Sequence, residues 1–324
     1  MRVQAEGIRN VALVGHRGAG KTSLNEALLF EAGAISRLGS VVDGTTASDI
    51  DADEQQRQLS ISLALTSFEW SGRKINLIDT PGEPSFVADA LGALRVCESA
   101  IFVVNAVMGA EVTTTRLWRV AAERDIARML FVNMLDRERA DFYRTLESLK
   151  AAFGQHVVAT EIPLGAEDEC VGVIDLVDMK AFRYDGAGRG NSVEIEIPAE
   201  ERERAQEYRE RLMEEVAEVS DELMERYLEG DEISHEEIVE ALRRGTNHGS
   251  IFPVVCGVAT RNLGTNRLLE AIVDDLPSPV EHGAFETDEI TLEPDSEREL
   301  FSYVFKTRAD PFAGRINLLR VFQG

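Results

Sequence analysis

A glycine-rich stretch near the N-terminus has the residue types and spacing of a phosphate-binding loop. Residues 15–22 read G-H-R-G-A-G-K-T and match G-x-x-x-x-G-K-[ST] at every fixed position. The apolar run Ile8–Val14 before it predicts a buried strand, and residues 23–32 after it have a helical pattern. In this setting backbone N–H groups and a helix N-terminus can surround phosphate oxygens. We expect nucleotide contacts from Gly15, His16, Arg17, Gly18, Ala19, Gly20, Lys21, Thr22 and Ser23.

The end of this loop and a second motif together predict a magnesium site. The Lys21 ammonium should reach the outer phosphates, and the Thr22 hydroxyl should bind Mg²⁺. A β-like run, residues 74–78, ends in D-T-P-G at residues 79–82. Asp79 can bind Mg²⁺ through water there, and the Gly82 N–H can meet a γ-phosphate. Lys21 and Gly82 are therefore candidate catalytic residues.

A third motif, N-M-L-D at residues 133–136, bears on the choice of base. An Asp136 carboxylate can accept hydrogen bonds from N1–H and the 2-amino group of guanine, whereas adenine would leave it unpaired at a cost of several kcal/mol. Taken alone, Asp136 could equally be a helix cap before Arg137, and the first loop could belong to an ATP-dependent enzyme. The order of the three motifs favours GTP and GDP, with contacts from Asn133, Met134 and Asp136.

The composition limits the class of protein. The chain has 324 residues, of which 44% are hydrophobic, and a formal charge of −24 from 58 acidic and 34 basic residues. This length suits about two domains of ~150 residues, and the acidic surface repels nucleic acid in general without excluding a local basic contact or a basic protein partner. No apolar run approaches the ~20 residues of a membrane span. Three dispersed cysteines without a C-x-x-C pair argue against disulfides or zinc. We expect a cytoplasmic, monomeric protein without a membrane partner.

The elements around the motifs indicate an α/β fold. Residues 38–60 are polar and read as a long mobile loop, followed by a hairpin of two β-like runs, 61–70 and 74–78. Strands at 100–105, 127–132 and 251–256 then alternate with helices at 111–124, 141–153 and 266–276. Such alternation predicts a mainly parallel sheet covered by helices on both faces.

Residues 156–250 interrupt that alternation. Short apolar runs at 171–176 and 193–197 predict a small β element, and 198–228 is an acidic helical region with one apolar stripe. Pro198 suits its first position and Gly230 its C-terminal stop. The interleaved Glu and Arg of its other face are consistent with plain solvation or with a partner surface.

The C-terminal part reads as a linker followed by two strands. Residues 277–298 are rich in proline and acidic side chains, and strands are expected at 299–308 and 314–322 around Asp310-Pro311. Because a lone two-stranded hairpin is marginal in water, either the hairpin packs on something else or the chain is a fragment. We favour a fragment.

The motifs, taken in order, resemble the translation elongation factor G family over essentially the whole chain. The resemblance is carried by G-H-R-G-A-G-K-T, G-T-T-A-S-D, D-T-P-G, F-V-N-M-L-D-R, C-G-V-A, D-D-L-P-S-P and V-F-K-T-R-A-D-P-F-A-G-R. It implies a P-loop NTPase fold at 1–282 with a subdomain inserted at 156–250. It also implies that 283–324 are a linker and the first strands of a truncated β-barrel domain. Mg²⁺, the ribosome and, through the helix near 198–228, the ribosomal stalk protein are the implied cofactor and partners.

The chain departs from the family at positions tied to hydrolysis. Gly18 replaces an acidic residue of the loop, and Ser60 stands where the family has a Mg²⁺-binding Thr. Most importantly, Glu83 stands at the position of the family's catalytic His, where its carboxylate would meet the like charge of a γ-phosphate.

Two further departures concern the base. Met134 replaces a Lys, and Val258-Ala259 replaces S-A near the guanine O6 position, although the Ala259 N–H could still serve. The sequence thus predicts either a translational GTPase, acting in translocation or ribosome disassembly, or a GTP-binding switch with weak or no hydrolysis.

Overall fold

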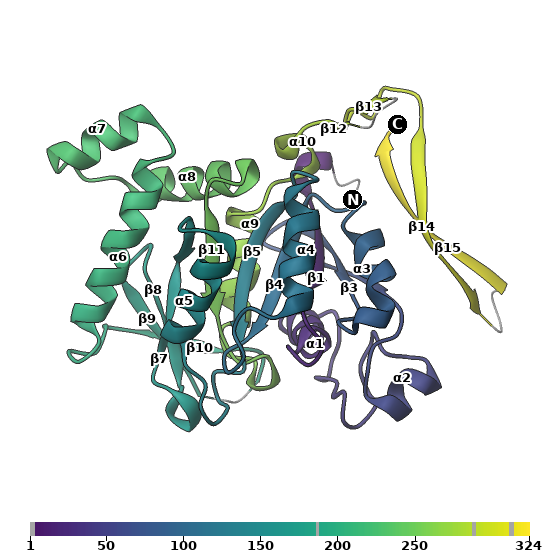
Figure 1. Ribbon diagram of the computed structural model, residues 1–324, viewed down its shortest axis with the longest axis horizontal. Coiled ribbons are helices and arrows are strands. Elements are labelled where there is room, and N and C mark those ends of the chain that lie inside the picture. Colours follow the sequence, from purple (N-terminus) through teal and green to yellow (C-terminus); the bar gives the residue numbers. More distant parts are fainter. Residues whose placement is uncertain (1–3, 186–187, 287–289, 311–313) are drawn as a thin grey trace.

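A seven-stranded sheet forms the centre of the computed structural model, which describes residues 4–185, 188–286, 290–310 and 314–324 (Figure 1). Its strand order is β2-β3-β1-β4-β5-β11-β6. Only the edge strand β2 runs antiparallel to its neighbour, so the prediction of a mainly parallel sheet is confirmed. The strands are β1 Ile8–Val14, β2 Ala64–Trp70, β3 Arg73–Asp79, β4 Ser99–Asn105, β5 Ala127–Asn133, β6 Val157–Ala159 and β11 Phe252–Cys256.

Helices cover both faces of this sheet because its strands are apolar on both sides. In β4, Ile101 and Val103 pack in one core cluster while Phe102 and Val104 pack in the other. Helices α1 (Lys21–Glu31) and α9 (Thr265–Asp274) cover the first face. Helices α3 (Val87–Ala93), α4 (Val112–Ala122) and α5 (Phe142–Phe153) cover the second. The alternation of strands and helices expected from the sequence is confirmed.

The segment 38–60 is not one continuous loop, which corrects the sequence prediction. It contains helix α2, Ala52–Arg57, whose first turn is closed by a capping box between Asp51 and Glu54. The Glu54 side chain is buried and also accepts the N–H groups of Ile61 at 2.9 Å and Ser62 at 3.0 Å. A six-residue helix without an apolar stripe has no periodic signal, so its cap was the only sequence trace of it.

Residues between β6 and β11 build a second, antiparallel sheet with order β10-β9-β8-β7. The expected runs at 171–176 and 193–197 are present as β8 and β10, whereas β7 and β9 were not expected. Strand β6 lies within the same range but belongs to the central sheet, where it pairs with β11. The four strands are β7 Glu161–Leu164, β8 Gly172–Asp175, β9 Lys180–Tyr184 and β10 Ser192–Ile195.

The acidic helical region is broken into two helices, which also corrects the prediction. Helix α6 spans Arg202–Ala217 and α7 spans Asp221–Glu229, because Ser220 caps α7 by accepting the Leu223 N–H. Pro198 lies in the turn before α6 rather than at its first position. Gly230 ends α7 in a left-handed conformation, as expected. A further helix, α8 (His235–His248), begins with a capping box that was not recognised in the sequence.

The C-terminal strands form a long antiparallel hairpin, β14 (Phe301–Asp310) and β15 (Gly314–Gln323), as expected. The expected turn at Pro311 lies outside the described residues. The linker is more structured than expected, since it holds α10 (Pro279–His282) and the short pair β12 (Phe285–Glu286) and β13 (Thr291–Leu292). In Figure 1 the hairpin stands beside α3, opposite α6 and α7. Four short 3₁₀ helices complete the described elements: η1 Ala5–Gly7, η2 Pro84–Phe86, η3 Glu167–Glu169 and η4 Ala259–Arg261.

Within the described ranges, none of the helices combines the length and apolar character needed to span a bilayer. The three cysteines, Cys97, Cys170 and Cys256, are free thiols buried in the protein.

Candidate nucleotide-binding site

The loop of residues 15–20 joins the end of β1 to the start of α1. Gly20 has a φ of +90°, and a Cβ at this position would collide with the Asn133 side chain, so only glycine fits. Among the described residues, the backbone N–H groups of Gly20, Lys21, Thr22 and Ser23 find no hydrogen-bond acceptor. Because these donors lie at the N-terminus of α1, the site is suited to an anion.

The Lys21 side chain lies inside the loop rather than in solvent. It is 6% exposed, and its Nζ donates to the carbonyl oxygens of Gly15 at 3.1 Å and His16 at 2.9 Å. Burial lowers the pKa of Lys21 to about 8, against the opposing effect of Asp79 and Glu111. A phosphate dianion at the loop would be a stronger acceptor than these carbonyl groups and would favour the charged ammonium.

The three residues expected to bind Mg²⁺ are brought together below the loop. Thr22 Oγ1 donates to Asp79 Oδ2 at 2.7 Å and lies 2.9 Å from Ser60 Oγ. Asp79 is 2% exposed, its Oδ1 has no partner among the described residues, and burial raises its pKa to about 7. An orphaned carboxylate oxygen beside two hydroxyls is the oxygen donor set that Mg²⁺ prefers, so these residues fit the ion.

A second buried carboxylate, Asp49, approaches this cluster from the loop before α2. Burial raises the pKa of Asp49, and the nearby Ser60 hydroxyl and Lys21 ammonium oppose that shift. Asp49 had no role predicted from the sequence, because an aspartate in a polar loop reads as solvated. The stretch G-T-T-A-S-D, which carried part of the family resemblance, was the only available signal.

The segment after β3 lies directly against the phosphate loop. A Cβ on Gly82 would lie 2.6 Å from the backbone nitrogen of Arg17 and would also meet Lys21 Nζ. A larger residue at position 82 would therefore push the two segments apart. One residue later, Glu83 Oε2 forms an ion pair of 3.1 Å with Arg17 Nη1. The Glu83 side chain is 25% exposed and that of Arg17 is 62% exposed. Glu83 is thus paired with a cation of the loop itself.

His16 connects the loop to the start of α4. Its Nδ1 lies 3.0 Å from Thr113 Oγ1, and its Nε2 lies 3.4 Å from Glu111 Oε1. Burial raises the pKa of Glu111, and His16 and Lys21 oppose that shift. These long-range contacts could not be read from the sequence, where His16 was only a member of the loop.

Asn133 joins the phosphate loop to the loop after β11. Its Nδ2 donates to Ala19 O at 3.0 Å, and its Oδ1 accepts the Ala259 N–H at 3.0 Å. The Ala259 donor that we expected to face guanine O6 is therefore already engaged within the protein. Val258, before it, is buried.

Two further residues of the third motif, Met134 and Asp136, follow Asn133 at the end of β5. Asp136 is half-buried, and its carboxylate accepts no hydrogen bond from the described part of the chain. Met134 adopts a left-handed φ of +65°, and its sulfur lies 3.4 Å from Asn105 Nδ2. The open acceptor of Asp136 remains available for a ligand.

Comparisons with known proteins identify the family of the chain. The family model for the elongation factor Tu GTP binding domain matches residues 6–278. Elongation factor G of Ureaplasma parvum serovar 3 is 38% identical over 98% of this chain, and elongation factor G of Ureaplasma urealyticum serovar 10 is equally similar. The chain spans only 47% of the length of these relatives.

Among solved structures, a Thermus thermophilus protein known from its crystal structure matches with a TM-score of 0.87 and 35% identity. That match covers 98% of this chain and 46% of the other. The chain therefore belongs to the family of the elongation factor Tu GTP-binding domain and is similar over nearly its whole length to elongation factor G.

Proposed function

We propose that this chain is the GTP-binding part of an elongation factor G-type translational GTPase. The observation that supports this best is the cluster of Thr22, Ser60 and Asp79 directly below a loop with open N–H groups. The unengaged Asp136 carboxylate at the other end of the site suits the N1–H and 2-amino donors of guanine. GTP and GDP are thus the proposed ligands.

The residues divide the work of nucleotide binding between them. Thr22 and Ser60 would hold Mg²⁺ by their hydroxyls, and Asp79 would hold it through water. When bound, Mg²⁺ supplies positive charge that offsets the charge of the phosphate groups. Lys21 would contribute a second positive charge at the outer phosphates, and Gly82, which lies against the loop, would offer its N–H to a γ-phosphate.

The ion pair between Arg17 and Glu83 supports a second candidate, a GTP-binding switch with slow or no hydrolysis. A carboxylate at the position of the family's catalytic His has to release Arg17 and approach a negative phosphate before it can orient a water molecule. In the alternative, Arg17 itself turns to the γ-phosphate and frees Glu83 to act as a base. The departures from the family at Gly18 and Ser60, like that at Glu83, favour slow hydrolysis of GTP.

The wider roles follow from the family. We propose the ribosome as the partner of the whole protein, a cytoplasmic monomer, and the ribosomal stalk protein as a partner of the face of α6 and α7. That face carries exposed acidic residues on both helices: Glu203, Glu207, Glu210, Glu214, Glu222 and Glu225. The proposed domain boundaries remain 1–282, with an insertion at 156–250, and 283–324.

Phosphate release from GTP, measured with and without ribosomes on a full-length form of the protein, separates the two candidates. The variants are Glu83→His, which restores the family residue, and Lys21→Ala, which removes a binding group. If Glu83 is the main defect, Glu83→His raises turnover at unchanged GDP affinity. Ribosome-stimulated turnover by the unaltered full-length protein at the rate usual for this class would contradict the switch. No gain in Glu83→His would show that Glu83 is not the main cause of slow hydrolysis.

A further inference from the structure

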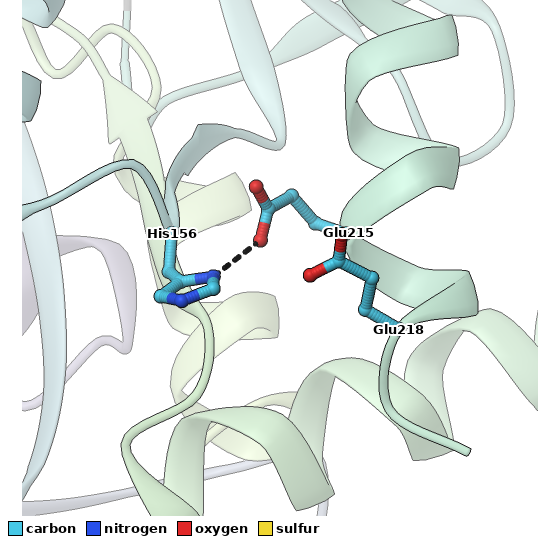
Figure 2. Close-up of side chains that lie close together, drawn as sticks. All are labelled: His156, Glu215 and Glu218. Carbon is cyan, nitrogen blue, oxygen red and sulfur yellow. Dashed lines mark hydrogen bonds and ion pairs between the residues drawn. The ribbon is translucent and has the colours of Figure 1, made fainter. Parts of the chain in front are cut away.

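A histidine and two glutamates outside the nucleotide site converge where α6 meets the central sheet. His156 directly precedes β6, Glu215 lies in the last turn of α6, and Glu218 is the residue that ends this helix. One potential ligand atom from each residue lies within 4.8 Å of the other two. Figure 2 shows the imidazole and both carboxylates pointing toward one another.

The local charges favour a cation between these side chains. Glu215 and Glu218 are three residues apart at the C-terminal end of α6, where like charges repel and the helix dipole is negative. Burial raises the pKa of Glu215, and the charge of Glu218 adds to that shift. His156 and Lys150 oppose it, but Lys150 is also paired with Glu147 at 3.8 Å. The His156 imidazole is thus the direct partner of Glu215, and among the described residues Glu218 forms no ion pair.

We propose that His156, Glu215 and Glu218 bind one divalent transition-metal ion of the Zn²⁺ type. An imidazole nitrogen and carboxylate oxygens are regular zinc ligands, and three of them leave one position for water. Because the imidazole is a poor ligand for hard cations, the set selects against Mg²⁺ and Ca²⁺. The dispersed cysteines take no part, so the lack of a C-x-x-C pair does not bear on this site.

The distances require only small side-chain movements. Ligand atoms around a tetrahedral zinc ion are about 3.3 Å apart, and His156 Nδ1 already lies 3.0 Å from Glu215 Oε2. The carboxylate oxygen of Glu218, the third ligand atom, lies at most 4.8 Å from the other two and has to move closer to them. His156 and Glu218 are both exposed, so their rotation disturbs no packed neighbour. A bound ion would tie the end of α6 to the edge strand β6, which it already contacts.

The test is calorimetric titration of Zn²⁺ into the 324-residue chain in excess Mg²⁺, which occupies sites made only of oxygen ligands. The variants are His156→Ala and Glu218→Gln. The matched control is His235→Ala, because His235 Nδ1 forms the same kind of pair with Asp178 at 2.6 Å. No group of three potential ligands that includes His235 occurs among the described residues.

We expect one Zn²⁺ per wild-type chain, binding at least tenfold weaker in His156→Ala and Glu218→Gln, and wild-type binding in His235→Ala. Melting temperatures without zinc should be equal, and zinc should raise them only in chains that keep the three ligands. Wild-type zinc affinity in His156→Ala, or no binding by the wild-type chain, would overturn the proposal. Neither result bears on guanine nucleotide binding.

Discussion

Glu83 and Arg17 place opposite charges where the phosphate loop meets the segment after β3. The pair is 3.1 Å long and partly solvated, so it contributes little to folding stability. The pair matters for nucleotide binding, because a γ-phosphate would be attracted to Arg17 and repelled by Glu83. Changing either charge should therefore alter the affinity for GTP, which has a γ-phosphate, more than the affinity for GDP.

We expect Glu83→Gln to tighten binding of a non-hydrolysable GTP analogue and to leave GDP binding nearly unchanged. An unscreened like-charge contact at ~5 Å opposes binding by roughly 3 kcal/mol, and solvent at Glu83 reduces the gain to about tenfold. Arg17→Ala is the matched variant and should weaken the analogue selectively. Fluorescence titration with both ligands measures the ratio, and an equal change for GDP and the analogue would exclude a role at the γ-phosphate.

Asn133 is expected to support both stability and nucleotide binding, because its two hydrogen bonds join the phosphate loop to the loop after β11. Asn133→Ala leaves the Ala259 N–H and the Ala19 carbonyl without their partner, which should lower the free energy of unfolding by about 2–3 kcal/mol. GDP affinity should fall as well.

The matched control is Asn76→Ala, which removes a hydrogen bond of 2.8 Å to Asn10 in the sheet, away from the loops. Urea denaturation and GDP titration of both variants separate the two effects. Loss of stability in both variants, with loss of GDP affinity only in Asn133→Ala, is the expected outcome; equal losses of affinity would mean that Asn133 acts only through stability.

At the level of single residues, the sequence predicted the chemistry of the site better than its contacts. Thr22, Ser60 and Asp79 were expected to share one ion and do lie together. The engagement of the Ala259 N–H by Asn133 was not foreseeable, because it joins residues 126 positions apart in two loops. Motifs specify residue types at fixed local spacing, whereas such contacts depend on how the loops pack.

At the level of elements, α2 controls the position of Ser60. The Glu54 side chain holds the chain before Ser60 through the capping box with Asp51. It holds the chain after Ser60 by accepting the N–H groups of Ile61 and Ser62. We expect Glu54→Ala to increase hydrogen exchange of residues 58–62 and to weaken the Mg²⁺ dependence of GDP binding. Asp53→Ala, at an exposed position of the same helix, is the control. Unchanged exchange at 58–62 would show that Glu54 does not hold this segment.

The end of α9 should make the folding stability depend on pH. Burial and the neighbouring Asp274 raise the pKa of Asp275 from 3.8 to about 8. Because the folded chain keeps this proton after the unfolded chain has lost it, the contribution is complete below about pH 4 and is lost as the pH rises to about 8. Asp275→Asn should flatten the fall of the free energy of unfolding between about pH 5 and pH 8. A slope identical to wild type in urea denaturation would contradict the assignment.

The central sheet was easier to predict than the insertion for a physical reason. Strands buried on both faces, such as β4 and β5, are continuous apolar runs bounded by turns. In the insertion, the buried residues of β9, Ala181 and Tyr184, are three positions apart and break the alternation expected of a half-buried strand. Helix α8 does have an apolar stripe, Ile238, Ala241 and Leu242, which the sequence prediction missed. The break between α6 and α7 rests on one cap at Ser220, which a continuous apolar stripe conceals.

At the scale of the whole molecule, a buried ion pair ties the C-terminal hairpin to the central domain. Arg320 of β15 donates to Glu98 at 2.5 Å, and Glu98 also accepts from Asn10 at 2.7 Å. Glu98 is fully buried, and burial raises its pKa to about 7 although Arg320 opposes the shift. The hairpin therefore packs on the part of the same chain that forms the central sheet. This is one of the two possibilities left open by the marginal stability of an isolated hairpin.

We expect Arg320→Met to destabilise the chain by about 3–5 kcal/mol, because it leaves a buried carboxylate without its cation. The control is Arg308→Met in the same hairpin, since the pair of Arg308 with Asp51 is exposed and worth at most about 1 kcal/mol. Thermal or urea denaturation measures both. Equal effects of the two substitutions would show that the pair with Glu98 does not anchor the hairpin.

The central claim, a guanine nucleotide site, is tested most directly by displacement of labelled GDP from the chain by GDP and by ADP. We predict displacement by GDP alone, and a shift of Asp136→Asn toward xanthine nucleotides, since an amide can donate to the O2 of xanthine where the carboxylate accepted from guanine. Equal displacement of the label by ADP and GDP would contradict it.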